Sequence, residues 1–186
     1  MEKISVVEYS PSWKTDFQKA KSFYRELLQD IESKVEHVGS TAVEGMWAKP
    51  ILDIDIIVIN SIDNGCVIEL LTGVGYVHLG NLGITGREAF TSPKNNPRIN
   101  WMEHHLYVCI KGSENLNNHL LLRKHLRNNI KAVEAYSKLK RKLAKEFTHD
   151  IDAYVEGKSG LIAGFLRAEG MDQDSIKRIS SINKKE

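Results

Sequence analysis

The chain has 186 residues, a formal net charge of +2, 41% hydrophobic residues and 27% charged residues. This is an ordinary composition for one soluble domain, and no apolar run approaches the ~20 residues that a membrane span requires. Cys66 and Cys109 lack the spacing of a metal site and predict reduced thiols. We therefore expect a cytoplasmic protein with no membrane partner.

The first 112 residues predict a mixture of strands and helices. A helix from Pro11 to about Gln29 repeats apolar residues at the spacing of one helical face. The clearest strands are Leu52–Ile59 and Ile99–Ile110, whereas Gly80–Arg98 is rich in Gly, Pro and Asn and predicts a hairpin or loop. Shorter elements are predicted as strands at Ile4–Tyr9, Val35–Val38 and Gly75–Leu79 and as a helix at Asp63–Thr72.

The second part of the chain predicts helices at Asn115–Arg127, Asn129–Phe147 and Asp150–Ala168. The expected fold class is α/β (α+β), with a small mixed sheet flanked by helices and a helical C-terminal half. We expect one domain over residues 1–170, with the sheet in about 1–112 and the helical portion in about 113–170. Residues 171–186 then form a polar C-terminal tail.

Two aspartates lie two residues apart in an apolar strand. Asp53 and Asp55 point to the same face, because a strand sends alternate side chains to opposite sides. Leu52 and Ile54 then point to the core. Two adjacent carboxylates on an apolar strand are costly unless a positive charge holds them, and oxygen ligands suit Mg²⁺ or Mn²⁺. The pattern predicts metal ligands, and its alternative is a strand end that faces solvent.

A Gly-Ser turn precedes this strand. Gly39-Ser40-Thr41 follows a predicted strand, and twelve residues separate Ser40 from Asp53. Backbone N–H groups and a hydroxyl in such a turn bind phosphate, although the turn alone is also typical of a tight connection. Together with the paired carboxylates, the turn favours a nucleotidyl or phosphoryl transfer site.

A distinctive motif runs over Val35–Gly45 and continues in Ala48–Ile54. With it, a stretch of about residues 4–167 resembles the GrpB family, within the polymerase-beta-like nucleotidyltransferase superfamily. It implies a nucleotidyltransferase-like fold. Two positions depart from the family pattern. Glu44 stands in place of the proline of the usual Val-Pro-Gly, and Tyr107 stands in place of the second histidine of the frequent His-Leu-His-Val. Further segments that carry the resemblance are Gly86–Phe90, His104–Val108, Asn118–Leu120 and Tyr136–Lys140.

The resemblance also implies a third carboxylate on a neighbouring strand. On Ile99–Ile110, Glu103 and His105 share one face, and Glu103 is the candidate third acid. A rim glutamate is its alternative. His105 is a candidate metal ligand or general base, or else a hydrogen-bonded structural histidine. His104 points to the core and is expected to be structural.

Four cations are candidate phosphate ligands, together with Gly39, Ser40 and Thr41. Lys49 precedes Pro50, Arg87 and Arg98 bracket the predicted loop, and Arg123 stands on a predicted helix. Charges at such positions are also typical of a solvated surface. Lys140 follows Tyr136 at helical spacing and is expected to be a packing residue.

The favoured function is a metal-dependent nucleotidyltransferase that moves a nucleoside monophosphate from a nucleoside triphosphate to a small-molecule or protein acceptor. Asp53, Asp55, Glu103 and His105 would be its catalytic residues, with Mg²⁺ or Mn²⁺ as cofactor. The alternative is a non-catalytic accessory module that binds a nucleotide or a CoA-type ligand. The near-neutral charge and the dispersed aromatic and basic residues argue against a nucleic-acid partner. The sequence does not determine the acceptor or the oligomeric state.

Overall fold

A computed structural model describes residues 3–93 and 96–182, and the chain divides into two compact units. The sheet unit comprises the described residues of Ser10–Val38 and Ile51–Asn117. The helical unit comprises the described residues of Met1–Tyr9, Gly39–Pro50 and Asn118–Glu186. The chain thus passes from one unit to the other several times.

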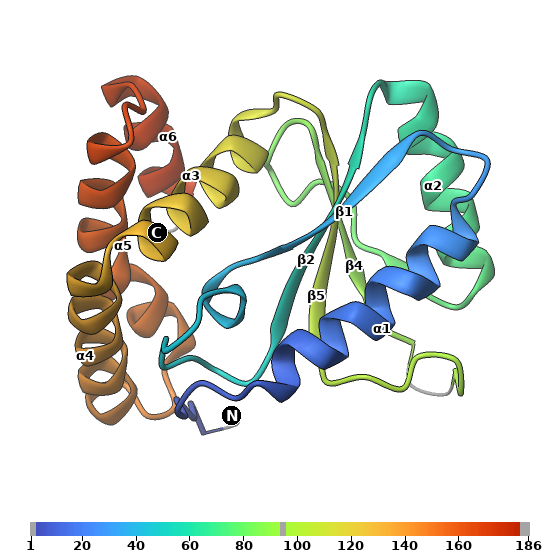
Figure 1. Ribbon diagram of the computed structural model, residues 1–186. Coiled ribbons are helices and arrows are strands. Elements are labelled where there is room, and N and C mark those ends of the chain that lie inside the picture. Colours follow the sequence, from blue (N-terminus) through green and yellow to red (C-terminus); the bar gives the residue numbers. More distant parts are fainter. Residues whose placement is uncertain (1–2, 94–95, 183–186) are drawn as a thin grey trace. The chain divides into compact units, whose positions relative to one another are not determined.

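The sheet unit carries a five-stranded mixed sheet in the order β1-β2-β5-β4-β3 (Figure 1). Strands β2 and β5 pair in parallel, and the other neighbours pair antiparallel. The parallel pair lies in the interior of the sheet, so both of its strands have a hydrogen-bonded neighbour on each side. The strands are β1 (Ser33–Val38), β2 (Leu52–Val58), β3 (Val77–His78), β4 (Arg87–Thr91) and β5 (His104–Ile110).

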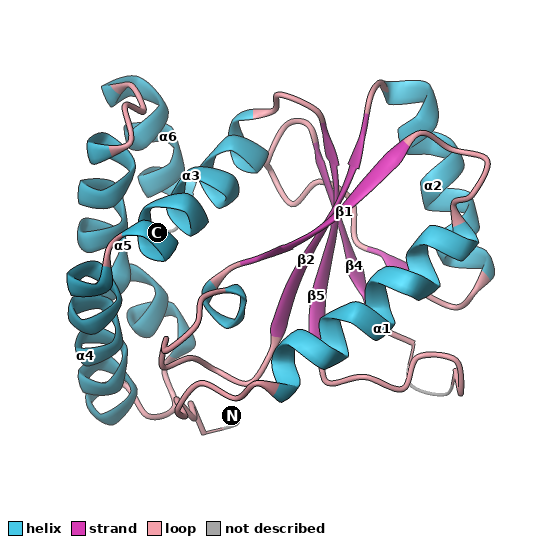
Figure 2. Cartoon of the chain, viewed as in Figure 1, coloured by secondary structure: helices cyan, strands magenta, loops and turns pink. Residues whose placement is uncertain are grey.

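In the described residues, the sheet unit also contains helices α1 (Ser12–Leu27) and α2 (Ser61–Gly73). The Asn60 side chain caps α2 by accepting hydrogen bonds from the N–H groups of Ile62 and Asp63. Helix α3 (Glu114–Asn128) begins in this unit and continues into the helical one. The helical unit adds the short 3-10 helix η1 (Ser40–Ala42), α4 (Ile130–Glu146), α5 (Ile151–Ala168) and α6 (Gln173–Ile182) (Figure 2).

One face of the sheet is buried as the alternation of β2 predicts. Leu52, Ile54, Ile56 and Val58 are fully buried. Helix α1 covers this face, because its Phe17 stacks on His37 of β1 and its Tyr24 contacts His104 of β5. The side chains of Asp53 and Asp55 therefore belong to the opposite face of the sheet.

His104 holds a buried polar network on the α1 side of the sheet. The indole N–H of Trp101 donates to His104 Nδ1 at 3.1 Å. The hydroxyl oxygens of Tyr76, Tyr24 and Ser92 lie 2.8, 3.1 and 3.1 Å from Nε2. Because Nδ1 accepts from Trp101, the proton of the neutral ring sits on Nε2. The expectation of a structural, core-facing His104 agrees with this geometry.

Burial lowers the pKa of His104 from 6.5 to about 4, which makes stability depend on pH. Between pH 6.5 and pH 4, this histidine binds a proton in the unfolded state but not in the folded state. Its full contribution to the free energy of unfolding is therefore present above about pH 6.5 and is lost as the pH falls toward 4. The shift corresponds to about 3 kcal/mol. Urea denaturation at pH 7.5 and pH 4 should show this loss in the native protein, with a smaller loss in His104→Gln. Equal losses would contradict the assignment.

The helical unit has its own apolar core. Val43 and Met46, which follow η1, pack with Leu126 of α3 and with Val133 and Tyr136 of α4. The N-terminal segment joins this unit through an isolated bridge between Val7 and Ala48, whose backbone groups exchange hydrogen bonds of 2.9 and 3.0 Å. Helix α6 contacts α5 and buries Ile176.

The α/β fold class and the mixed sheet with a helical C-terminal half are confirmed, with two corrections to the strands. Ile4–Tyr9 forms a single bridge instead of an edge strand. β5 begins at His104 and not at Ile99, because residues 99–103 form irregular chain with a bend at Trp101. The segment Gly80–Arg98, predicted as a hairpin or loop, contains β4, which pairs antiparallel with β3 and with β5. No helix in residues 3–93 and 96–182 has the length and apolarity needed to cross a bilayer.

Candidate functional site

The candidate site is the face of the sheet that carries Asp53 and Asp55. In the parallel pairing of β2 with β5, Asp53 lies beside His105 and Asp55 lies beside Tyr107. This register agrees with the parity predicted for His105. The Asp55 side chain is fully buried, whereas 32% of the Asp53 side chain is exposed. Asp53 is therefore the carboxylate that solvent reaches.

Asp53 and His105 form a hydrogen-bonded pair. His105 Nδ1 lies 3.0 Å from Asp53 Oδ1, and 51% of the imidazole is exposed. A carboxylate that accepts from one ring nitrogen fixes the tautomer and leaves the other nitrogen to act as a base or a ligand. This pair has the local geometry of an oriented histidine.

Tyr107 and Arg87 form the neighbouring part of the same face. The Arg87 guanidinium lies 4.8 Å from the centre of the Tyr107 ring, and β4 pairs Arg87 with Cys109. Burial and, to a lesser extent, the nearby Asp53 charge raise the pKa of Tyr107 to about 12, and Arg87 opposes this rise. Tyr107 thus stays a neutral hydroxyl at physiological pH, and Arg87 adds a positive charge near the aspartates.

A further carboxylate that the sequence interpretation did not single out faces Asp55. Glu36 of β1 lies directly opposite Asp55 in the antiparallel pairing, so the two side chains share one face. Only 14% of the Glu36 side chain is exposed, and Lys34 Nζ lies 2.6 Å from its Oε1. The parity of Ser33–Val38 against Leu52–Val58 was the signal that places Glu36 beside the pair.

Glu103, the predicted third acid, lies before β5 instead of within it. Its backbone carbonyl accepts a hydrogen bond from Leu52 N–H at 2.9 Å, and its side chain is exposed. Glu103 is therefore anchored by its backbone at the start of the parallel pair. Its role as the third acid stays a prediction.

The Gly-Ser turn belongs to the helical unit, where it meets a buried lysine. Gly39 has a φ of 68°, a left-handed conformation that favours glycine, and η1 follows at Ser40. Lys140 of α4 donates from Nζ to Ser40 Oγ at 2.9 Å, lies 4.5 Å from the centre of the Tyr136 ring and is 2% exposed. The Arg127 guanidinium donates to the Ala42 carbonyl at 2.8 and 3.1 Å. Two cations therefore hold this turn.

The other predicted phosphate ligands are dispersed. Thr41 is buried in η1, and Lys49 is half-buried in the same unit. Arg123 is half-buried on α3. Arg98 pairs with Glu26 of α1 at 2.8 Å and therefore contacts the helix that covers the face opposite to the aspartates. These four assignments stay predictions.

The donor set on the carboxylate face suits a hard divalent cation. Mg²⁺ takes oxygen ligands and is usually bound through one or two carboxylates, with water and substrate phosphates completing the octahedron. Asp53 and Asp55 supply two such carboxylates on one strand face. Among residues 3–93 and 96–182, no group of three or more His, Cys, Asp and Glu side chains is arranged to hold a metal by itself. The residues thus fit a Mg²⁺ that substrate helps to bind.

Comparisons with known proteins identify the family. The GrpB protein family model matches residues 3–168. A UPF0157 protein of Halalkalibacterium halodurans is 32% identical over 165 residues, which cover 88% of this chain and 81% of that protein. The crystal structure of the conserved protein GrpB from Enterococcus faecalis has a TM-score of 0.75 and 27% identity, covering 94% of this chain and 99% of that chain.

A more distant likeness shows the fold. A crystal structure of the Cid1 poly(U) polymerase with bound MgGTP has a TM-score of 0.53 and 15% identity. The match covers 75% of this chain and 44% of the polymerase chain, so this chain spans less than half of that protein. The likeness supports a nucleotidyltransferase-like architecture. On the family match and this architecture, the chain belongs to the GrpB family and has a nucleotidyltransferase-like fold.

Proposed function

We propose that the chain is a metal-dependent nucleotidyltransferase that transfers a nucleoside monophosphate from a nucleoside triphosphate to an acceptor hydroxyl of a small molecule or protein. The observation that carries the proposal is the pair Asp53 and Asp55 on one strand face, with His105 hydrogen-bonded to Asp53. The fold shared with a polymerase whose structure is named for bound MgGTP supports the choice of ligand.

The reaction assigns each group a role. Asp53 and Asp55 would hold Mg²⁺, which would neutralise the charge that develops on the phosphate oxygens. His105, oriented by Asp53, accepts the proton of the acceptor hydroxyl. The acceptor oxygen bonds to the α-phosphorus as the bond from that phosphorus to the bridging oxygen breaks, and pyrophosphate leaves with the bonding electrons.

The phosphate-binding role falls to Ser40 and Lys140 in the helical unit. An ammonium and a hydroxyl 2.9 Å apart offer several donors to a phosphate oxygen, and the Gly39 backbone permits close approach. Lys140 is buried as a whole residue, and its hydrogen bond to Ser40 fixes the position of the ammonium. This assignment is independent of the carboxylate assignment, and separate variants test the two.

A second candidate function is a nucleotide- or CoA-type binding module without turnover. The positions of β5 that face Asp53 and Asp55 hold His105 and Tyr107, so the neighbouring parallel strand supplies a base and a phenol instead of a carboxylate. The further carboxylate on this face, Glu36 of β1, is paired with Lys34. This observation favours binding over chemistry.

One pair of measurements separates the two functions. A thermal-shift panel of nucleoside triphosphates and CoA with and without Mg²⁺ identifies the ligand, because a ligand of the folded state raises Tm. A pyrophosphate-release assay across hydroxyl acceptors then measures turnover. Mg²⁺-dependent stabilisation with pyrophosphate release is the result expected of the transferase. Stabilisation without release supports the binding module, and no stabilisation by any nucleotide or by CoA contradicts both.

A further inference from the structure

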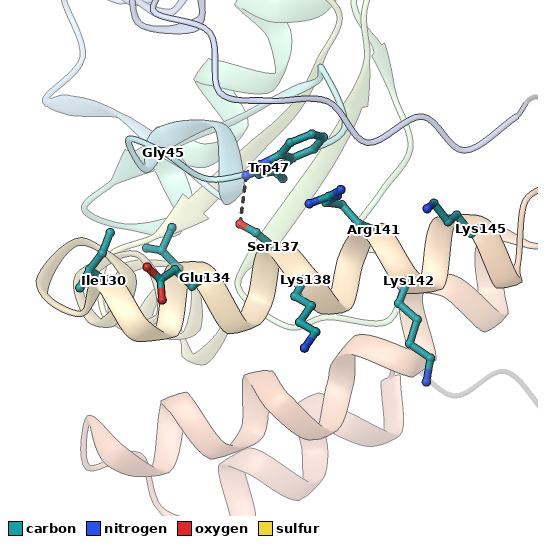
Figure 3. Close-up of a pocket in the computed structure, with 10 residues that line it drawn as sticks. Gly45, Trp47, Ile130, Glu134, Ser137, Lys138, Arg141, Lys142 and Lys145 are labelled. Carbon is teal, nitrogen blue, oxygen red and sulfur yellow. Dashed lines mark hydrogen bonds between the residues drawn. The ribbon is translucent and has the colours of Figure 1, made fainter.

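A groove runs along α4 of the helical unit, outside the residues assigned above to metal and phosphate (Figure 3). Its volume is about 820 Å³, and a second hollow of about 470 Å³ shares Trp47, Arg141 and Lys145 with it. The two hollows therefore meet at these three side chains. Because the two hollows meet, the groove suits an extended ligand better than a compact one.

The wall of the groove is strongly basic. Lys138, Arg141, Lys142 and Lys145 line it and are exposed, so their charges face solvent in the free protein. Helix α4 as a whole carries six Lys or Arg residues and two Glu residues. The net charge of the entire chain is only +2, because acidic residues elsewhere offset the positive charge of α4. The overall composition therefore does not reveal this basic surface, which suits a polyanionic partner.

An aromatic ring stands within the row of cations. Trp47 is half-buried, and its backbone N–H donates to Ser137 Oγ at 3.1 Å, which ties it to α4. The Arg141 guanidinium lies 4.2 Å from the centre of the Trp47 ring. Figure 3 shows Trp47 beside Ser137 and Arg141 at the groove. This combination of a fixed ring and a stacked guanidinium is a platform on which a nucleobase stacks.

We propose that this groove binds single-stranded nucleic acid. The eight residues from Lys138 to Lys145 rise about 10 Å along the helix, so the cations meet successive phosphates of an extended strand. The Trp47 ring supplies stacking for an unpaired base of the same strand. The bases of a duplex are already paired and stacked, and polyphosphate has no base, so both ligands should bind less tightly than a single strand. The binding is independent of the transferase activity proposed above.

Fluorescence anisotropy with a fluorescein-labelled, mixed-sequence 12-nucleotide RNA tests the proposal. With four phosphate contacts, log K is expected to fall with log salt at a slope of about −3. Lys138→Gln and Lys145→Gln should each reduce the slope by about 0.7. Lys131→Gln removes an exposed lysine of the same helix that does not line the groove, and it should leave the slope unchanged.

The stacking contribution has its own variants. Trp47→Ala should weaken RNA binding roughly 5- to 100-fold, and Trp47→Phe, which keeps a ring, should restore most of it. Thermal melts of both variants verify folding. The proposal is overturned if the RNA does not bind at low salt, or if groove and control variants bind alike. Binding of a duplex of the same length or of inorganic tripolyphosphate as tight as that of the single strand would also overturn it.

Discussion

Asp53→Asn and Asp55→Asn are each expected to weaken Mg²⁺-dependent binding of a nucleoside triphosphate by more than ~100-fold. Asn keeps the shape of Asp but removes the negative charge that attracts the cation. Loss of a residue that only supports a ligand costs 10- to 100-fold in metal affinity, so loss of a ligand itself costs more. The measurement is the shift in Tm as the nucleoside triphosphate is titrated at a fixed concentration of Mg²⁺.

The control for these variants is Asp30→Asn, which removes one exposed carboxylate in the turn after α1. It should bind the nucleotide as the native protein does. Asp53→Asn is the more decisive variant, because 32% of this side chain is exposed and the exchange leaves the core intact. Binding that survives in both Asp variants would refute the metal assignment.

Lys140→Met is expected to weaken triphosphate binding roughly 10- to 100-fold, whether or not Mg²⁺ is present. The variant keeps the apolar stem that lies over Tyr136 and removes the ammonium that contacts Ser40. Charge-assisted hydrogen bonds contribute about 1.5–3 kcal/mol each, which sets this range. Stability should change little, because an apolar residue of similar volume often replaces a buried charge without penalty. Isothermal titration with and without Mg²⁺ measures the effect.

Lys158→Met is a matched control for Lys140→Met. Lys158 Nζ lies 4.5 Å from the centre of the Tyr154 ring, the same separation as that between Lys140 and Tyr136. The two variants thus remove the same kind of cation–π contact, and Lys140→Met also removes the hydrogen bond to Ser40 of the Gly-Ser turn. Equal binding losses in both would show that the effect of Lys140→Met is not specific to the turn.

Strand parity in the sequence predicted the carboxylate face well. Alternation over residues 52–59 placed Asp53 and Asp55 together, and alternation over residues 99–110 placed His105 on the same face. Such alternation works because each strand is buried on the opposite side, which fixes which way every second residue points. Helices α1 to α5 were predicted because their apolar residues repeat at helical spacing, whereas α6 lies in the segment expected to be a polar tail.

Neither strand parity nor helical spacing predicts contacts between residues that are far apart in sequence. Lys140 was interpreted as a packing residue, because helical spacing relates it to Tyr136 and gives no sign of Ser40, which lies 100 residues earlier. Glu36 was missed because the pairing partner of β1 is a tertiary property. The predicted start of β5 is too early, because Ile99, Trp101 and Met102 extend the apolar character of the strand into a segment whose backbone is irregular and bends at Trp101. The β-propensity of a segment indicates that a strand forms there, whereas pairing with a neighbouring strand determines where that strand begins and ends.

The most direct test of the metal assignment is a crystal structure with Mn²⁺ and a non-hydrolysable nucleoside triphosphate analogue, with the metal located by its anomalous signal. Mn²⁺ takes the place of Mg²⁺ at oxygen ligands. We predict Mn²⁺ in contact with carboxylate oxygens of Asp53 and Asp55, at about 2.1 Å, and with phosphate oxygens of the analogue. A bound analogue whose metal touches neither aspartate would contradict the assignment.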